Sequence, residues 1–254
     1  MDWIKFLGTA GARFVVSKQL RSSGGIWMSL AGQEILIDPG PGTLVHCLKS
    51  HPKLDPGKLD AIILTHKHLD HSGDVNVMIE AMTEGRLRKR GVIFAPADAF
   101  ENDPVIFSYL KDYPEKIEIL KEKKEYRLGD LTIKTPVKQI HHGVESYGLN
   151  LEGGKKSVSL IADTRYFEGI ESFYPGEILI LYVVLLQPFA DRVIDHLNLG
   201  DAERIIDANR PGLTLLTHFG LTMLRSKPWK LAEALSQKLK VKVQAARDGM
   251  SIEL

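Results

Sequence analysis

Residues 65 to 74 read THKHLDHSGD, and this stretch decides how the whole chain is interpreted. The apolar run 61–64 comes directly before it. Three histidines and one aspartate fall within six residues: His66, His68, Asp70 and His71. Their spacing does not fit one face of a helix, where residues four apart are neighbours, but it is typical of a loop that leaves a buried strand. Because imidazole and carboxylate ligands together suit zinc, iron or manganese, the stretch predicts a metal site, and a merely histidine-rich polar loop is the alternative.

Further candidate ligands follow strand-like segments later in the chain. The pair His141-His142 follows TIKTPVKQI, Asp163 follows SVSLIA, and His218 follows LTLLT. Polar side chains at the carboxyl ends of several strands gather at one edge of an α/β fold. A single histidine after a strand is more often a buried structural side chain, so the prediction of a metal centre depends on the convergence of four strand ends. The spacing alone leaves open which histidine of the pair faces the centre.

Composition and charge exclude several classes of protein. The 254 residues carry 33 Lys and Arg against 32 Asp and Glu, so no overall field attracts nucleic acid or a membrane. Cys47 is the single cysteine, which excludes intrachain disulfides and a Cys-rich zinc site. The longest apolar run, 178–186, is too short to span a membrane and predicts a buried strand. The start, MDWIK, has no secretory pattern, so the cytoplasm is the expected compartment.

The order of elements favours one α/β domain over residues 1–254, with no linker and no repeat clear enough to claim. The segments IWMSL and EILID around Ala31-Gly32 predict a hairpin that ends in Asp38. Asp38 is expected to lie in a turn beside the metal loop, where it can orient a ligand histidine. Apolar spacing predicts helices over residues 43–50, 75–83, 200–210 and 228–239.

THKHLDH, followed by His142, Asp163 and His218 in that order, resembles the metallo-β-lactamase fold superfamily. The resemblance extends from FLGT near the start to DGM near the end. It implies a four-layer αββα sandwich and two divalent metal ions, with zinc first and manganese or iron as alternatives. It also implies the ligands: His66, His68 and His142 for one ion, Asp70, His71 and His218 for the other, and Asp163 as the bridge.

Within this superfamily, HHGVESYG and DHLNLGDAERIIDANRPGLTLLTHFG are most similar to ribonuclease Z and the phosphoribosyl cyclic phosphate phosphodiesterases. In these relatives a short segment ending in an aromatic residue and a glycine follows the ligand histidine, and Tyr147-Gly148 therefore favours His142 over His141. The resemblance implies that His196 is not a ligand but contacts the phosphate or acts as an acid. Asp195 is interpreted as a turn or capping residue.

The expected function is hydrolysis of a small or cyclic phosphodiester. A hydroxide bridging the two ions is the expected nucleophile, and Asp70 is placed to orient it or take its proton in addition to ligating. The site would be net positive, so a small anionic substrate is the expected partner. The relatives are commonly dimers, so a homodimer is an alternative to a monomer and the sequence leaves the oligomeric state open. A membrane is not an expected partner.

Two departures from the relatives limit this expectation. Only twenty residues separate His142 from Asp163, where ribonuclease Z carries a long arm that grips tRNA, and the Cys-rich zinc site of the cyclic phosphodiesterase is missing. An endoribonuclease with RNA at the basic cluster 86–90 is therefore an alternative, although a solvated helix end explains that cluster better. A lactone or thioester hydrolase would fit the same ligand pattern, and so would a metal-binding protein without catalytic activity.

Overall fold

Alternating side chains build the first of two large sheets. In β1 (Trp3–Phe6), Ile4 and Phe6 point to one face and Lys5 to the other. From one edge of this sheet to the other, three antiparallel strand pairings are followed by three parallel ones. The strand order is β17 (Ser251–Glu253), β1, β2 (Ile26–Leu30), β3 (Gln33–Ile37), β4 (Ala61–Ile63), β5 (Val92–Ala95) and β6 (Lys116–Ile119).

The second sheet repeats this pattern in the same chain direction. When its strands are followed in chain order, three antiparallel pairings come first and three parallel ones follow. A short strand, β14 (Leu197–Asn198), pairs with β13 (Ile178–Leu185). The order is β16 (Val243–Ala245), β15 (Leu213–Thr217), β13 (Ile178–Leu185), β12 (Lys156–Ile161), β11 (Leu149–Gly153), β8 (Leu131–Thr135) and β7 (Lys124–Leu128). The common pattern shows an internal symmetry that the sequence does not reveal.

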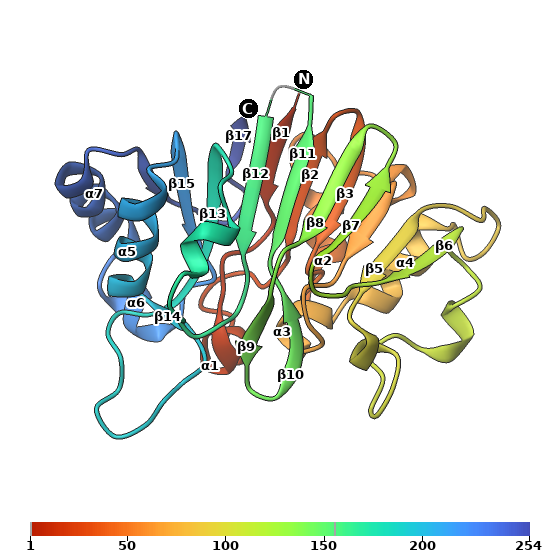
Figure 1. Ribbon diagram of the computed structural model, residues 1–254. Coiled ribbons are helices and arrows are strands. Elements are labelled where there is room, and N and C mark those ends of the chain that lie inside the picture. The colour runs from red at the N-terminus through yellow and green to blue at the C-terminus, as the bar shows by residue number, and fades with distance from the viewer. Residues whose placement is uncertain (1, 155) are drawn as a thin grey trace.

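The computed structural model describes residues 2–154 and 156–254. Its two large sheets pack face to face, and helices cover their outer faces (Figure 1). The helices are α1 (Ala12–Ser17), α2 (Thr43–Lys49), α3 (Leu69–Ser72), α4 (Val75–Met82), α5 (Leu199–Asn209), α6 (Leu221–Arg225) and α7 (Pro228–Leu239). Short 3₁₀ helices cover Pro56–Lys58, Ala97–Ala99, Ser108–Leu110 and Ile170–Phe173.

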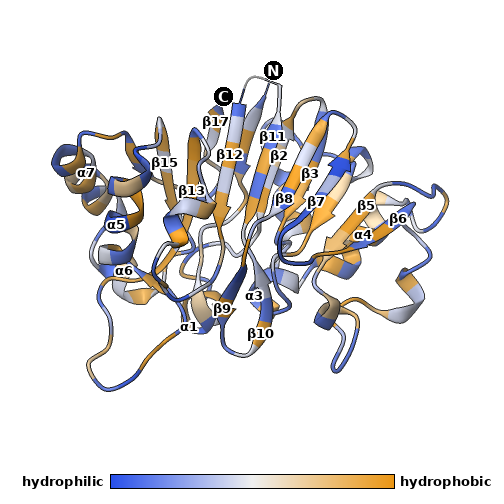
Figure 2. Cartoon of the chain, viewed as in Figure 1, coloured by the Kyte–Doolittle hydropathy of each residue, from blue (hydrophilic) through white to orange (hydrophobic). Residues whose placement is uncertain are grey.

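Three apolar cores separate the four layers. The central core joins the inner faces of both sheets, for example Phe6 and Ile180. A second core packs α5, α6 and α7 against the outer face of β13, and a third packs α2 and α4 against the outer face of the first sheet. Figure 2 shows apolar residues concentrated along the strands, β13 and β3 among them. The predicted αββα sandwich is confirmed.

The long apolar run is a strand, as predicted. All eight residues of β13 are buried, since one face meets the central core and the other meets the helices. Among the described residues, no helix combines the length and the apolar character needed to cross a membrane.

One edge of the sandwich collects the short elements. There α1 and α3 lie close to a separate hairpin made of β9 (Lys138–His141) and β10 (Val144–Tyr147), at the bottom of Figure 1. The strands β4 and β15 both end at this edge, and the predicted ligands lie here.

Candidate metal centre

The histidine loop begins two residues after β4 ends. His66 is fully buried, and α3 begins directly after His68, so Asp70 and His71 lie in one short helical turn. The Ser72 hydroxyl donates to the carbonyl oxygens of Lys67 and His68 and holds the loop in this shape. The loop therefore directs several polar side chains toward the edge between the two sheets, as the spacing predicted.

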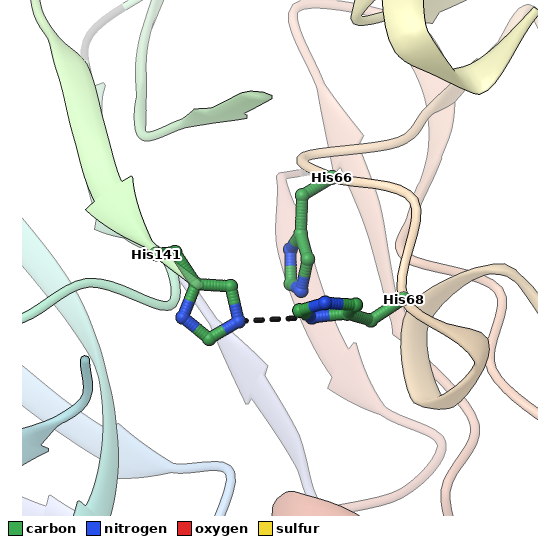
Figure 3. Close-up of side chains that lie close together, drawn as sticks. All are labelled: His66, His68 and His141. Atoms are coloured by element: carbon green, nitrogen blue, oxygen red, sulfur yellow. Dashed lines mark hydrogen bonds between the residues drawn. The ribbon is translucent and has the colours of Figure 1, made fainter. Parts of the chain in front are cut away.

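Three histidines form the first group of candidate ligands. His66 and His68 come from the loop, and His141 comes from the end of β9 on the opposite side; their rings point toward one another (Figure 3). One nitrogen from each ring lies within 4.8 Å of the others, and His68 Nδ1 is 2.9 Å from His141 Nε2. Three converging imidazole nitrogens can hold one divalent ion.

The second group contains both carboxylates. It comprises Asp70, His71, Asp163 and His218, again with one ligand atom each within 4.8 Å. Asp163, which follows β12, is central to both groups. Its Oδ2 lies 3.3 Å from His218 Nε2, 3.4 Å from His71 Nε2, 3.7 Å from His141 Nε2 and 3.9 Å from His66 Nε2. This carboxylate therefore lies where a ligand shared by two ions would lie.

The structure differs from the sequence prediction at the histidine pair. It places His141, not His142, beside His66 and His68. In β9 the alternate residues Gln139 and His141 are buried, whereas the side chain of His142 is 40% exposed. His142 and Gly143 form a two-residue hairpin turn with φ of 41° and 75°, which takes His142 out of the strand. The alternation of the strand and the glycine after the pair were the patterns that would have selected His141.

Unpaired buried atoms support a metal in this place. Within the described part of the chain, five buried polar atoms at this edge have no hydrogen-bond partner: His66 Nε2, His71 Nε2, His218 Nε2, Asp163 Oδ1 and His196 Nδ1. Leaving one buried polar atom unsatisfied costs about 1–3 kcal/mol. Because four of these atoms belong to predicted ligands, the donor set fits divalent ions of the zinc, manganese or iron type.

Asp38 contacts His71 directly and His66 through Thr65. Its Oδ2 accepts hydrogen bonds from the Thr65 hydroxyl at 2.8 Å and the Tyr182 hydroxyl at 3.1 Å, and it lies 2.9 Å from His71 Nδ1. The Thr65 hydroxyl in turn lies 3.1 Å from His66 Nδ1. These contacts favour a proton on Nδ1 of His66 and His71, which in the neutral rings leaves Nε2 as the ligand atom. Asp38 thus lies beside the metal loop, in contact with a candidate ligand histidine, and its role in orienting that ligand stays a prediction.

We expect the Asp38→Asn variant to bind metal about ten to a hundredfold more weakly, the usual effect of removing an outer partner of a ligand histidine. The shape of the side chain is kept, but the amide cannot accept from Thr65, Tyr182 and His71 together. Competition with a fluorescent chelator measures the affinity. Asp55→Asn is the matched control, because Asp55 is exposed and its carboxylate accepts from the Gly57 amide, away from the metal centre. An unchanged affinity in Asp38→Asn would contradict the assigned role.

His196 and Asp195 lie on the outer side of the first group. His196 Nδ1 is 3.4 Å from Asp163 Oδ1, and its ring is 4.8 Å from that of His141. The Asp195 carbonyl oxygen lies 2.8 Å from His141 Nδ1, and its carboxylate accepts from the His142 amide. Asp195 is thus more than the turn or capping residue that was expected, because it fixes the orientation of His141. His141, His142 and His196 form a third group of converging nitrogens.

Burial and charge set the protonation of the histidines and carboxylates. Burial is the main cause that lowers the pKa of His66 well below its usual value and that of His141 to about 4, so both rings are neutral and able to ligate. Burial raises the pKa of Asp163, but His218 and His196 outweigh it and hold the pKa well below the usual range. Asp163 is therefore an anion in the absence of metal.

The backbone is in a sparsely populated conformation at several positions of this edge. Asp38, His142 and His218 have φ of 53°, 41° and 59°, the left-handed region that non-glycine residues rarely adopt. A Cβ atom on Gly11 would lie 2.1 Å from the His218 carbonyl oxygen, so the chain passes His218 at a distance that only glycine permits. Such strain persists where the surrounding structure fixes it, and it clusters at functional sites.

Comparison with known proteins agrees with this geometry. The family model described as beta-lactamase superfamily domain matches residues 33–219. An uncharacterized protein of Methanocaldococcus jannaschii is 28% identical over 99% of this chain and 94% of its own. Ribonuclease Z of Methanopyrus kandleri is 27% identical over 70% of this chain, but the match spans 59% of that protein.

The fold has close counterparts among solved structures. The metallo-β-lactamase fold protein YhfI from Bacillus subtilis superposes with a TM-score of 0.79 over 100% of this chain and 99% of its own, at 22% identity. The family match covers most of the chain, and it includes the histidine loop, His141, Asp163 and His218. The chain therefore belongs to the β-lactamase superfamily and has the metallo-β-lactamase fold.

Proposed function

We propose that this protein is a dinuclear metal-dependent phosphodiesterase that acts on a small or cyclic phosphodiester. The observation that carries the proposal is the position of Asp163 Oδ2, which lies within 3.9 Å of four imidazole Nε2 atoms from two ligand groups. His66, His68 and His141 would hold one ion, and Asp70, His71 and His218 the other, with Asp163 shared. Zinc is the first candidate, and manganese or iron are alternatives.

Bound ions in such a site supply Lewis acidity and lower the pKa of water to near neutrality. The residues of the chain then position the substrate and move protons. Asp70 Oδ2 lies 3.8 Å from His71 Nε2 and 3.7 Å from His218 Nε2, and its side chain is 14% exposed, so it faces the substrate side of the second group. From there it can accept a proton from the attacking water in addition to ligating.

His196 is the proposed partner of the phosphate. Burial lowers the pKa of His196, but the neighbouring Asp163 carboxylate outweighs burial and raises the pKa above its usual value. Nδ1 faces Asp163, which leaves Nε2 of the same ring free for a substrate. A protonated His196 can donate to the leaving alkoxide or bind a non-bridging phosphate oxygen.

We expect His196→Ala to keep both metal ions and to hydrolyse bis-p-nitrophenyl phosphate about a hundredfold more slowly or worse, the scale of general acid catalysis. Absorbance at saturating substrate gives the turnover, and elemental analysis of the same sample gives the metal content. Val193→Ala is the control on the same loop, since Val193 is 76% exposed. Loss of metal from His196→Ala would show that His196 is a ligand instead.

RNA cleavage is the second candidate, favoured by the match to ribonuclease Z. The basic cluster 86–90 gives it little support, because Arg90 pairs with Asp60 and Arg88 with Glu84 within the chain. A steep fall of RNA affinity with salt would favour this candidate. Parallel assays of a phosphodiester, a lactone and a thioester with the same metal-loaded protein separate the phosphodiesterase from the other hydrolases of this fold.

A further inference from the structure

A basic cavity lies apart from the candidate metal centre. It has a volume of about 410 Å³ and opens between β1, the last turn of α2 and the turn that precedes β17. Four of its lining residues are basic or contain imidazole: Lys5, His46, Lys49 and His51. None of the residues that line it belongs to either group of candidate ligands. The cavity is large enough for a small organic molecule as well as an inorganic ion.

Lys5 is the unusual residue of this cavity. It occupies the middle of β1 on the face turned away from the central core and is only 4% exposed. Its ammonium group donates to the His51 carbonyl oxygen at 3.2 Å and to the Ser251 hydroxyl at 3.3 Å. An ammonium has three donors, so one remains for the cavity. Within residues 2–154 and 156–254, no carboxylate lies within ion-pair distance of it.

A buried cation without an anionic partner is costly, so its presence needs an explanation. The single acid that lines the cavity does not provide one. Asp248 accepts a hydrogen bond from the Thr9 hydroxyl with one oxygen and from the Ser22 amide with the other. His46 and Lys49 also stabilise the C-terminal end of α2, which explains those two residues but not Lys5. An anion inside the cavity would satisfy Lys5 and gain from its basic neighbours.

We propose that this cavity binds a small phosphate-type oxyanion, either free or as the phosphomonoester of a small molecule. Lys5 supplies a buried ammonium from the sheet, and Lys49 supplies a second one from the exposed rim. Lysine is a common phosphate ligand because its compact charge can be approached from many directions. The site is distinct from the metal centre, so the proposal does not depend on the reaction that the metal centre catalyses.

Histidine NMR can test binding in the cavity itself. The metal-loaded protein, with 15N-labelled imidazoles, is titrated with inorganic phosphate at constant ionic strength. We expect the resonances of His46 and His51 to shift saturably, with a Kd of about 1 mM or lower. Phosphate at the metal centre would instead shift the resonances of the ligand histidines. A parallel titration with glycerol 3-phosphate shows which ligand the cavity prefers. Tighter binding than that of inorganic phosphate indicates a phosphomonoester, and equal or weaker binding indicates free phosphate.

Two lysine variants make the site assignment falsifiable. Lys5→Met and Lys49→Met should each raise the Kd for phosphate about tenfold or more, since one charge-assisted hydrogen bond is lost. The Kd is obtained from the shifts of the His46 and His51 resonances. Lys53→Met, at an exposed lysine outside the cavity, should leave it unchanged. If Lys5→Met folds poorly by circular dichroism, Lys49→Met decides, because its side chain is exposed. Shifts that do not saturate, or an unchanged affinity in Lys49→Met, would overturn the proposal.

Discussion

Asp163→Ala is expected to lose both metal ions and, with them, measurable hydrolysis. Among residues 2–154 and 156–254, Asp163 is the carboxylate with ion-pair contacts to histidines of both candidate ligand groups, and its Oδ2 is within 3.9 Å of four imidazole nitrogens. Without it, each ion would keep only its outer ligands and the two positive charges would no longer share an anion. Removing an outer partner of a ligand typically costs ten to a hundredfold in metal affinity, so the loss of a shared ligand should exceed about a hundredfold.

Two measurements check this result. Elemental analysis after purification without chelator gives the occupancy, and a thermal melt with added zinc gives the stabilisation by bound metal, which should be several degrees in the wild type and absent in the variant. Asp163→Asn keeps the side-chain volume and should behave like the alanine variant, because the negative charge is what is lost. Asp207→Asn, at an exposed site on α5, is the matched control. Full occupancy of two ions in Asp163→Ala would remove Asp163 from the shared position.

Much of the fold could be predicted because the patterns that determine it are local. The apolar run that became β13 has no polar residue over eight positions, and such a run fits a strand buried on both faces. The predicted helix 75–83 became α4 (Val75–Met82), and its apolar spacing is the face that packs on the first sheet. The grouping of the loop histidines with Asp163 and His218 could be predicted because several strands ended in ligand-type residues.

Other features depend on contacts between segments that are distant in the sequence. The contact of the Asp195 carbonyl oxygen with His141 is one of them. Every residue has a backbone carbonyl, so the sequence does not show which one will contact a ligand. The matching pattern of the two sheets is another, since pairing direction follows from the whole topology. Lys5 has the alternation of an ordinary exposed strand residue, but it is buried, and its ammonium contacts segments distant in the sequence at His51 and Ser251.

His141→Ala and His142→Ala are expected to behave very differently, although the two residues are adjacent. His141 is nearly fully buried, and its Nε2 lies 2.9 Å from His68 Nδ1 and 3.7 Å from Asp163 Oδ2. Its Nδ1 is held by the Asp195 carbonyl oxygen, which leaves Nε2 for the metal. We therefore expect His141→Ala to lose at least one ion and to reduce turnover by more than about a hundredfold.

His142→Ala should keep both ions, because the exposed ring lies in the hairpin turn and is not part of the group formed by His66, His68 and His141. Its backbone amide, which donates to Asp195, is unchanged by the substitution. Elemental analysis of the two variants side by side, together with phosphodiester turnover, separates the roles. The opposite outcome, with metal lost from His142→Ala and kept in His141→Ala, would restore the ligand that the family resemblance favours. It would also mean that the β9–β10 turn rearranges when the ions bind, because in its left-handed turn conformation His142 is not part of the ligand group that contains His66 and His68.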